Sequence, residues 1–245
     1  MKTRLDQLLL LHGLAPTLQK AQALIAAGQV LVNDQPADKA GSLFAEESRI
    51  RLRGKACPYV SRGGVKLAAG LDYFHLDPAG LICADIGAST GGFTDCLLQH
   101  GAARVYAIDV GYGQLAWKLR QDPRVTVMER TNARNLQPGD LEDPLDLAVI
   151  DASFISLKTL LPPLLVFFRG AVRVLALIKP QFEVGKGKLG TGGVVRDNEL
   201  HEKVIDEIRG FAGKLDLIPV GVCPSPILGP KGNREFLIYL VSEMR

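Results

Sequence analysis

Four charged residues at the ends of apolar runs could together activate a weak nucleophile. Asp151 ends the run Leu-Ala-Val-Ile-Asp, Lys179 ends Val-Leu-Ala-Leu-Ile-Lys, and Glu235 begins Glu-Phe-Leu-Ile-Tyr-Leu. Lys66 lies near the start of a predicted helix that precedes these runs. Taken alone, each of them is better explained as an exposed charge at a strand end. Three such charges on one edge of a sheet, beside a ligand-binding loop, favour a reaction centre.

The chemistry that these residue types suit is deprotonation of a hydroxyl group. A ribose 2′-hydroxyl is a poor nucleophile at neutral pH and needs a base or a cationic environment. A second lysine nearby lowers the pKa of a lysine by like-charge repulsion, which can free an amine to take the proton. We therefore expect Lys179 to activate the hydroxyl. Lys66 and Asp151 would tune and orient it, and Glu235 would anchor the lysines.

The run from Asp85 to Phe93, Asp-Ile-Gly-Ala-Ser-Thr-Gly-Gly-Phe, has the composition of a ligand-binding loop. It ends one predicted strand and opens a helix, where glycines allow close approach and free N–H groups face a ligand. Asp109 closes the next strand, where an acid can hold both hydroxyls of a ribose. The pattern favours S-adenosylmethionine. Its predicted binding residues are Asp85, Gly87, Ser89, Thr90, Gly91, Gly92, Phe93, Asp109, Val110 and, as a weaker adenine contact, Asn132.

Two other interpretations of this loop are disfavoured. A dinucleotide fingerprint needs glycine where Ser89 stands. The run Gly87-Ala-Ser-Thr-Gly91 also fits the nucleophile elbow of a hydrolase. That elbow normally lies in the middle of a sheet, whereas this strand is the first of its domain. His201, the histidine that follows within reach of a triad role, lies in a polar helical stretch.

Alternating strands and helices would position these groups. Such alternation predicts a parallel, doubly wound sheet. The last two strands are joined by a Pro/Gly-rich loop without a helix, so we expect the final strand to run antiparallel. Its start would then lie on the same edge as the ends of the others. Predicted strands span 81–86, 104–109, 125–129, 145–150, 172–178, 217–222 and 235–241, and helices span 92–100, 112–120, 155–168 and 198–213.

The first 55 residues have a different organisation. Apolar positions of helical period at 4–12 and 17–27 precede a short strand, Val30–Val32, and a turn at Asn33. A second strand at 50–53 alternates apolar with basic residues. This segment holds eight Lys or Arg and five Asp or Glu, so it carries the whole net charge of +3. A basic module of this kind suits RNA, although a helical cap or a dimerisation module remains an alternative.

The run from Arg4 to Leu9 and the run from Lys20 to Asn33 resemble an S4 RNA-binding domain. In that family, a helix pair and the following hairpin grip folded RNA through phosphate contacts. The resemblance therefore implies salt-sensitive RNA binding by this segment. The expected RNA contacts of the whole chain are Arg4, Lys20, Arg62, Lys186 and Lys188. The last two lie in a Gly-rich stretch, 185–193, that fits a flexible connector as well as an RNA-facing lid.

Longer motifs across the whole chain resemble the TlyA family of rRNA methyltransferases with an S4 domain, historically labelled haemolysins. They are Tyr59-Val-Ser-Arg-Gly-Gly-Val-Lys66, the loop 85–95, Asp109-Val-Gly-Tyr-Gly-Gln-Leu, Asp151-Ala-Ser-Phe-Ile-Ser-Leu-Lys, Leu177-Ile-Lys-Pro-Gln-Phe-Glu-Val-Gly and Gly192-Gly-Val-Val-Arg-Asp. The resemblance implies an α/β architecture: an S4 domain at 1–55, a linker at 56–60, and a Rossmann-like class I methyltransferase domain with a mostly parallel seven-stranded sheet at 61–245.

The same resemblance implies an activity. The Lys-Asp-Lys-Glu tetrad of FtsJ-type 2′-O-methyltransferases is matched by Lys66, Asp151, Lys179 and Glu235. It further implies S-adenosyl-L-methionine as cofactor and cytidine ribose in ribosomal RNA as target. Family members differ in whether they modify one ribosomal subunit or both, and in terminal extensions. Only three residues precede Arg4, which favours the large subunit alone.

The composition argues against several other classes of protein. The 245 residues are 47% hydrophobic, and the four cysteines form no C-x-x-C pair, which favours reduced thiols in the cytoplasm and argues against zinc. The most apolar stretch, about 160–178, contains a Pro-Pro pair and two arginines, which disfavours a membrane span. The alternatives kept are an RNA-binding protein without catalysis and a membrane-lytic protein. Base methylation is disfavoured because Asp151-Ala-Ser-Phe lacks the two prolines of an amino-methylating motif.

Overall fold

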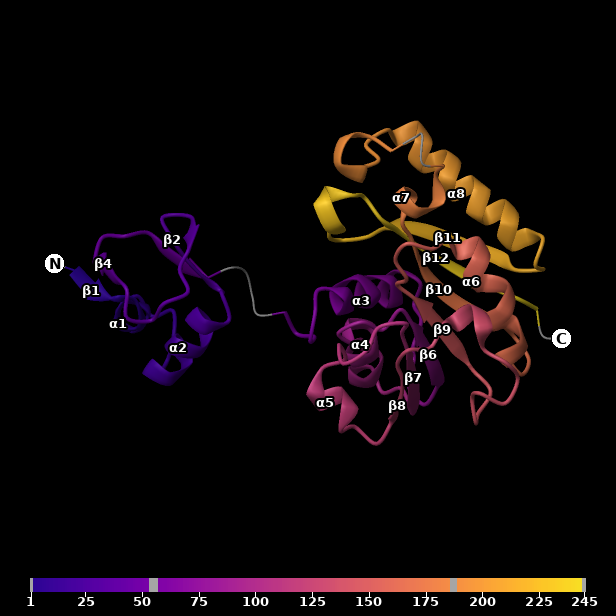
Figure 1. Cartoon of the computed structure of the whole chain (residues 1–245), viewed down its shortest axis with the longest axis horizontal. Helices are drawn as coiled ribbons and strands as arrows, with labels where there is room; N and C mark the ends of the chain where they lie inside the picture. The colour runs from indigo at the N-terminus through magenta and orange to yellow at the C-terminus, as the bar shows by residue number, and fades with distance from the viewer. Residues whose placement is uncertain (1, 53–56, 186–188, 244–245) are drawn as a thin grey trace. The chain divides into compact units, whose positions relative to one another are not determined.

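A computed structural model describes residues 2–52, 57–185 and 189–243 of the chain (Figure 1). The chain divides into two compact units, residues 1–57 and residues 58–245. Each unit has a hydrophobic core of its own. The fold predicted from the sequence, a small N-terminal domain followed by a domain with a mostly parallel seven-stranded sheet, is confirmed.

The first unit packs two helices against short antiparallel strands. Leu5 and Leu9 of the first helix meet Ala21 and Ile25 of the second, because these apolar residues recur at helical spacing. The Thr17 side chain accepts a hydrogen bond from the Lys20 N–H and caps the second helix, as such residues do. The elements are β1 (Lys2–Arg4), α1 (Leu5–Leu11), α2 (Leu18–Ala26), β2 (Val30–Val32), β3 (Gln35–Pro36), β4 (Leu43–Ala45) and β5 (Ile50–Leu52).

The second unit is built on a seven-stranded sheet of order β11-β12-β10-β9-β6-β7-β8. Its strands are β6 (Ile82–Ile86), β7 (Arg104–Ile108), β8 (Val125–Met128), β9 (Leu147–Ile150), β10 (Arg173–Ile178), β11 (Ile218–Pro224) and β12 (Phe236–Val241). Its helices are α3 (Gly63–Tyr73), α4 (Gly92–Gln99), α5 (Trp117–Arg120), α6 (Leu157–Leu164), α7 (Pro180–Glu183) and α8 (Asn198–Gly213), with short 3-10 turns η1 (Ala133–Asn135), η2 (Leu165–Phe167), η4 (Thr191–Gly193) and η5 (Pro230–Gly232).

The direction of the last strand agrees with the sequence prediction. Strand β12 is inserted between β10 and β11 and pairs antiparallel with both, whereas β6 to β10 pair in parallel. The Pro/Gly-rich connection of β11 to β12 is too short for a crossover helix, so only a reversal of direction can bring the strands together. The start of β12 therefore lies at the edge where the parallel strands end.

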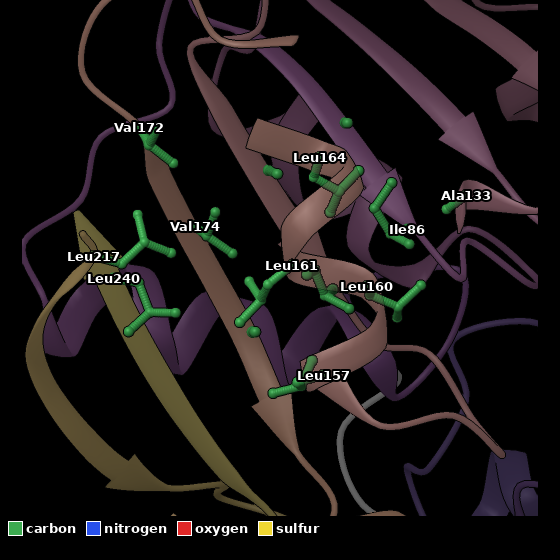
Figure 2. Packing of buried hydrophobic residues seen from close by; sticks show 14 of the residues in the cluster. Ile86, Ala133, Leu157, Leu160, Leu161, Leu164, Val172, Val174, Leu217 and Leu240 are labelled. Carbon is green, nitrogen blue, oxygen red and sulfur yellow. The ribbon is translucent and has the colours of Figure 1, made fainter. Parts of the chain in front are cut away.

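Helices cover both faces of this sheet (Figure 1). Leu157, Leu160, Leu161 and Leu164 of α6 point toward the sheet and pack with Val174 (Figure 2). Helix α8 joins this cluster, while α3 and α4 belong to a second cluster on the opposite face. Apolar residues facing both ways explain why the central strands are near-continuous hydrophobic runs.

One helix prediction differs from the structure. The helix expected at 112–120 is present only as α5, because part of the preceding segment bonds to other loops: Gln114 N donates to Glu129 and Ala116 N donates to the Thr90 carbonyl. The Pro-Pro pair does not break α6, which continues through Pro162 and Pro163 to Leu164. Each proline removes one backbone N–H donor from the helix, and the short 3-10 turn η2 follows directly after Leu164. Among the described residues, no helix is both long and apolar enough to cross a bilayer.

Candidate active site

The four residues of the predicted tetrad come from separate elements that meet at one edge of the sheet. Asp151 follows β9 and Lys179 follows β10, two strands that pair in parallel, so both residues lie at the carboxyl edge. The antiparallel register pairs Ile178 with Phe236, which places Glu235 at that edge too. Lys66 reaches the same place from α3. Parallel strands concentrate ligand-binding side chains at this edge.

The tetrad forms two ion pairs. The Lys66 Nζ lies 2.6 Å from the Glu235 Oε2, and the Lys179 Nζ lies 2.5 Å from the Asp151 Oδ1. The expectation that Glu235 anchors both lysines differs from this arrangement, since each lysine has a carboxylate of its own. The resting site therefore holds two ammonium–carboxylate pairs side by side at one edge.

The first pair, Lys66–Glu235, is buried. Lys66 is 8% exposed and Glu235 2% exposed. The Glu235 Oε1 has no hydrogen-bond partner among the described residues. A Cβ on Gly229 would collide with this carboxylate, so only glycine lets the loop cover it. A buried charge needs its partner, and truncating either residue would leave the other unpaired.

The second pair is partly open. The Lys179 Nζ also donates to the Ser153 Oγ at 3.0 Å and to the Asp151 carbonyl at 3.2 Å. The Asp151 side chain is 19% exposed. Asp151 therefore fixes the ammonium group while one face of the pair remains accessible to a substrate.

Both pairs adjoin a cavity of about 440 Å³. Lys66, Asp151, Ser153 and Lys179 line its interior, together with the start of α4. Predicted cofactor residues line it as well: Gly87, Ser89, Thr90, Gly92 and Phe93. The loop 227–231 closes another side. The cavity brings the tetrad and the glycine loop into one space.

The glycine loop takes a conformation that its sequence explains. Gly87 and Gly91 have φ of 87° and 94°, which glycine adopts without strain. A Cβ on Gly91 would collide with Leu119, so this residue also permits close packing. Ser89, with φ 48°, is held by its N–H, which donates to the Asp109 Oδ2 at 2.7 Å. The Asp109 Oδ1 accepts from the Gly111 N–H at 2.6 Å.

Asp85 lies beneath this loop and is fully buried. Its Oδ2 accepts hydrogen bonds from the Thr94 N–H and Oγ1, at 2.9 and 2.6 Å. Its Oδ1 has no partner among the described residues. Burial raises the pKa of Asp85 to about 7, and the hydrogen bonds from Thr94 oppose part of that shift. Asp85 therefore shapes the loop from below.

A second cavity, of about 550 Å³, shares Gly87, Ser89, Asp151 and Ser153 with the first. It is lined by Asp109, Val110 and Asn132, and by apolar side chains that include Ile108, Ala133, Ile155 and Leu160. These groups fit S-adenosylmethionine. An apolar slot suits the flat purine, and a carboxylate suits the ribose hydroxyls. The Asn132 side chain caps η1 through the Arg134 N–H, so its oxygen already has a structural role.

The residues predicted for RNA contact are spread over both units. In the first unit, Lys20 is exposed on the first turn of α2, and the exposed Arg4 is held by the buried Asp6, with contacts of 2.7 and 3.0 Å. The pair lowers the pKa of Asp6 to about 2. In the second unit, Arg62 lines the 440 Å³ cavity. Lys186 and Lys188 lie outside the described residues.

Sequence reasoning missed several residues that line the site. Ser153 stands two positions after Asp151 in a motif that was already singled out, so its spacing could have indicated it. Gly229 and Lys231 arrive from the β11–β12 loop, where a Pro/Gly-rich composition predicts only a turn. Nothing in their local sequence indicates a site. Among the described residues, no group of three or more His, Cys, Asp or Glu could hold a metal ion.

Comparisons with known proteins assign both units. An FtsJ-like methyltransferase model matches residues 59–242, and an S4 domain model matches residues 3–50. The 16S/23S rRNA (cytidine-2′-O)-methyltransferase TlyA of Mycobacterium tuberculosis is 46% identical over 98% of this chain and 90% of its own. Hemolysin A of Brachyspira hyodysenteriae is 38% identical over 97% of this chain and 99% of its own.

A solved structure described as a hemolysin, from Streptococcus thermophilus, is 44% identical with a TM-score of 0.78 and covers 99% of this chain and 89% of that one. This chain is thus similar, over almost its whole length, to one protein named for rRNA methylation and to two named for haemolysis. The chain belongs to the FtsJ-like methyltransferase family and carries an S4 domain before its catalytic domain.

Proposed function

We propose that this protein transfers a methyl group from S-adenosylmethionine to the ribose 2′-hydroxyl of a cytidine in ribosomal RNA, in the cytoplasm. The observation that carries the proposal is the pair of lysine–carboxylate contacts beside a cavity that adjoins the cofactor pocket. The M. tuberculosis relative is named for the same reaction on 16S and 23S rRNA. We further propose that the modified cytidine lies in the RNA of the large ribosomal subunit.

The second cavity would hold the cofactor. Asp109 would accept hydrogen bonds from the ribose hydroxyls, and the apolar wall around Ala133 would face the adenine. The loop from Gly87 to Phe93 would face the methionine part. When bound, S-adenosylmethionine supplies an electrophilic methyl group on a sulfonium. The protein then has to bring an oxygen nucleophile in line with it and remove one proton.

Lys179 is the group proposed to receive that proton. The 2.5 Å contact with Asp151 holds the Lys179 Nζ at the cavity wall, and after one proton has left to solvent the neutral amine faces the substrate. The amine accepts the 2′-hydroxyl proton as the oxygen attacks the methyl carbon. Ser153 holds the Lys179 Nζ in place from a third direction. Lys66 stays charged against Glu235 and stabilises the developing negative charge on the oxygen.

The first unit is proposed to hold the RNA. Its exposed Arg4 is already fixed by Asp6, so little side-chain freedom is lost when a phosphate binds. Lys20 would add a second phosphate contact from α2. Binding through these cations should weaken as salt rises.

The test is ribose methylation of rRNA by the Lys179→Ala variant. Large ribosomal subunits from cells that lack the gene would be incubated with the protein and labelled S-adenosylmethionine. We expect wild-type protein to methylate a cytidine ribose and Lys179→Ala to be slower by roughly 100- to 10,000-fold. Cofactor affinity should be unchanged in the variant, because Lys179 faces the substrate. If Lys179→Ala methylates the RNA at the wild-type rate, Lys179 is not the base. If the wild-type protein transfers no methyl group, the proposed reaction is wrong.

Lys158→Ala is the matched control for that experiment. Lys158 pairs with Glu207 on the surface, at 2.9 Å, and does not line either cavity. Its loss should leave the methylation rate unchanged, since an exposed ion pair contributes little to stability.

A further inference from the structure

Two cations at the mouth of the 440 Å³ cavity have no part in the reaction described above. Arg62 and Lys231 line this cavity and have exposed side chains. Arg62 lies at the start of α3, and Lys231 lies in the loop between β11 and β12. One hydrogen bond ties these two segments, from Arg62 to the Leu228 carbonyl at 3.4 Å. The cavity mouth is therefore bordered by positive charge from two elements.

These two charges are uncompensated within the described part of the chain. The charged residues that line the cavity are Arg62, Lys66, Asp151, Lys179 and Lys231. Lys66 pairs with Glu235 and Lys179 pairs with Asp151. Among the residues that the structure describes, neither Arg62 nor Lys231 forms a salt bridge. The mouth therefore attracts an anion, while the interior is balanced.

Lys231 is held in an unusual backbone conformation. Its φ is 58°, in the left-handed region that a lysine rarely adopts. The turn is fixed by Asn233, which is 3% exposed and whose side chain donates to the Pro230 and Gly193 carbonyls and accepts from the Val195 N–H. A residue whose backbone is held in a rarely adopted conformation at the edge of a cavity is a candidate for function.

We infer that Arg62 and Lys231 bind the backbone phosphates on the two sides of the target ribose. This inference rests on the proposed function. In RNA, the reacting hydroxyl is on C2′, and the neighbouring carbon, C3′, carries the 3′-phosphate. The 5′-phosphate is attached through C5′, on the other side of the same sugar. If the hydroxyl reaches Lys179 inside the cavity, both phosphates remain at its mouth. Two cations that come from separate elements and line that mouth match this pair of anions and fix the sugar for in-line attack.

The experiment compares charge-removing and charge-keeping variants on purified large ribosomal subunits that lack the modification. Arg62→Gln and Lys231→Gly remove one cation each. Glycine adopts the φ of position 231 freely, so Lys231→Gly removes the charge without straining the turn. Lys231→Arg keeps the charge. Lys214→Ala is the matched control, because Lys214 is exposed beyond α8, at the opposite edge of the sheet.

Each charge-removing variant should lower kcat/KM for the subunit by about tenfold. It should also reduce the slope of log kcat/KM against log salt by about 1, because one phosphate contact is lost. The affinity for S-adenosylmethionine, measured by calorimetry, should stay at the wild-type value. Lys231→Arg should restore most of the activity, and Lys214→Ala should match the wild type in all three measurements.

Three outcomes would overturn the inference. Wild-type kcat/KM and salt slope in Lys231→Gly and Arg62→Gln would show that no phosphate is held there. A parallel loss of cofactor affinity would show that these cations bind the cofactor carboxylate instead. A wild-type protein that transfers no methyl group to the subunit would remove the proposed function, and the inference with it. The first two outcomes leave the proposed function intact.

Discussion

Lys66 and Glu235 are 169 positions apart in the sequence, yet their side chains meet at 2.6 Å in a buried place. Burying an ion pair costs desolvation that the mutual attraction rarely repays with a surplus, so such pairs add little stability. A site that retains one buried pair and one partly open pair beside a cavity is better explained by chemistry than by folding. The residue types alone predicted that these four side chains form a reaction centre. Which lysine pairs with which carboxylate was decided by the fold.

Asp85 should make stability depend on pH. Burial raises its pKa from 3.8 to about 7, so the folded protein holds this proton more tightly than the unfolded chain does. The free energy of unfolding should therefore fall as the pH rises from about 4 to about 7 and stay low above that. In Asp85→Asn there is no proton to lose. Relative to wild type, the variant should gain roughly 2 kcal/mol between pH 5 and pH 8.

Urea unfolding of both proteins at several pH values would measure this difference. Because only position 85 differs, the comparison cancels the titrating groups that do not interact with it. If the two stability curves run parallel from pH 5 to pH 8, Asp85 does not titrate in that range and its ordinary pKa is retained in the folded protein.

At the scale of elements, α3 carries Lys66 and packs directly on the start of α4. The contact is close because of Gly92, where a Cβ would collide with the Ser61 Oγ and lie 2.9 Å from the Gly64 N. The position of Lys66 thus depends on a residue that was predicted for cofactor contact. Gly92 also lines the 440 Å³ cavity, so the same residue allows the helix contact and forms part of the cavity wall.

Two glycine-to-alanine variants should have opposite effects. Gly92→Ala should force α3 away from α4, destabilise the protein by about 1–3 kcal/mol and lower kcat by displacing Lys66. Gly210→Ala, in α8, meets no atom within 4 Å and should stabilise the protein by about 0.5–1 kcal/mol with unchanged activity. Thermal unfolding and methyl-transfer rates would measure both. Equal stabilities would contradict the close α3–α4 contact.

At the scale of the molecule, each unit has its own core, so binding of RNA and binding of cofactor should be separable. We expect a chain of residues 58–245 to unfold cooperatively and to bind S-adenosylmethionine with the affinity of the whole protein. Its KM for the large subunit should rise at least tenfold, because the basic excess of residues 1–55 is lost. Steady-state kinetics at two salt concentrations would test this.

Two results with the chain of residues 58–245 would contradict the separate roles of the two units. An unchanged KM would mean that the S4 unit does not hold the substrate. A loss of cofactor affinity would mean that the second unit does not complete its pocket alone.

Much of this protein was determined by local sequence. Near-continuous apolar runs predicted the strands, and apolar positions of period 3.6 predicted most helices, because these signals act within a few residues. The loop from Asp85 and the charges at strand ends were visible for the same reason. The helix predicted over residues 112–116 was wrong, because backbone groups of this segment form hydrogen bonds with other loops instead.

Only the tertiary structure decided the rest. The pairing of Lys66 with Glu235, the approach of Gly229 to that carboxylate and the place of Lys231 at the cavity mouth all depend on how β12 is inserted between β10 and β11. These contacts join segments that are distant in the chain. Packing of the whole core fixes their geometry, and no short window of residues contains that information.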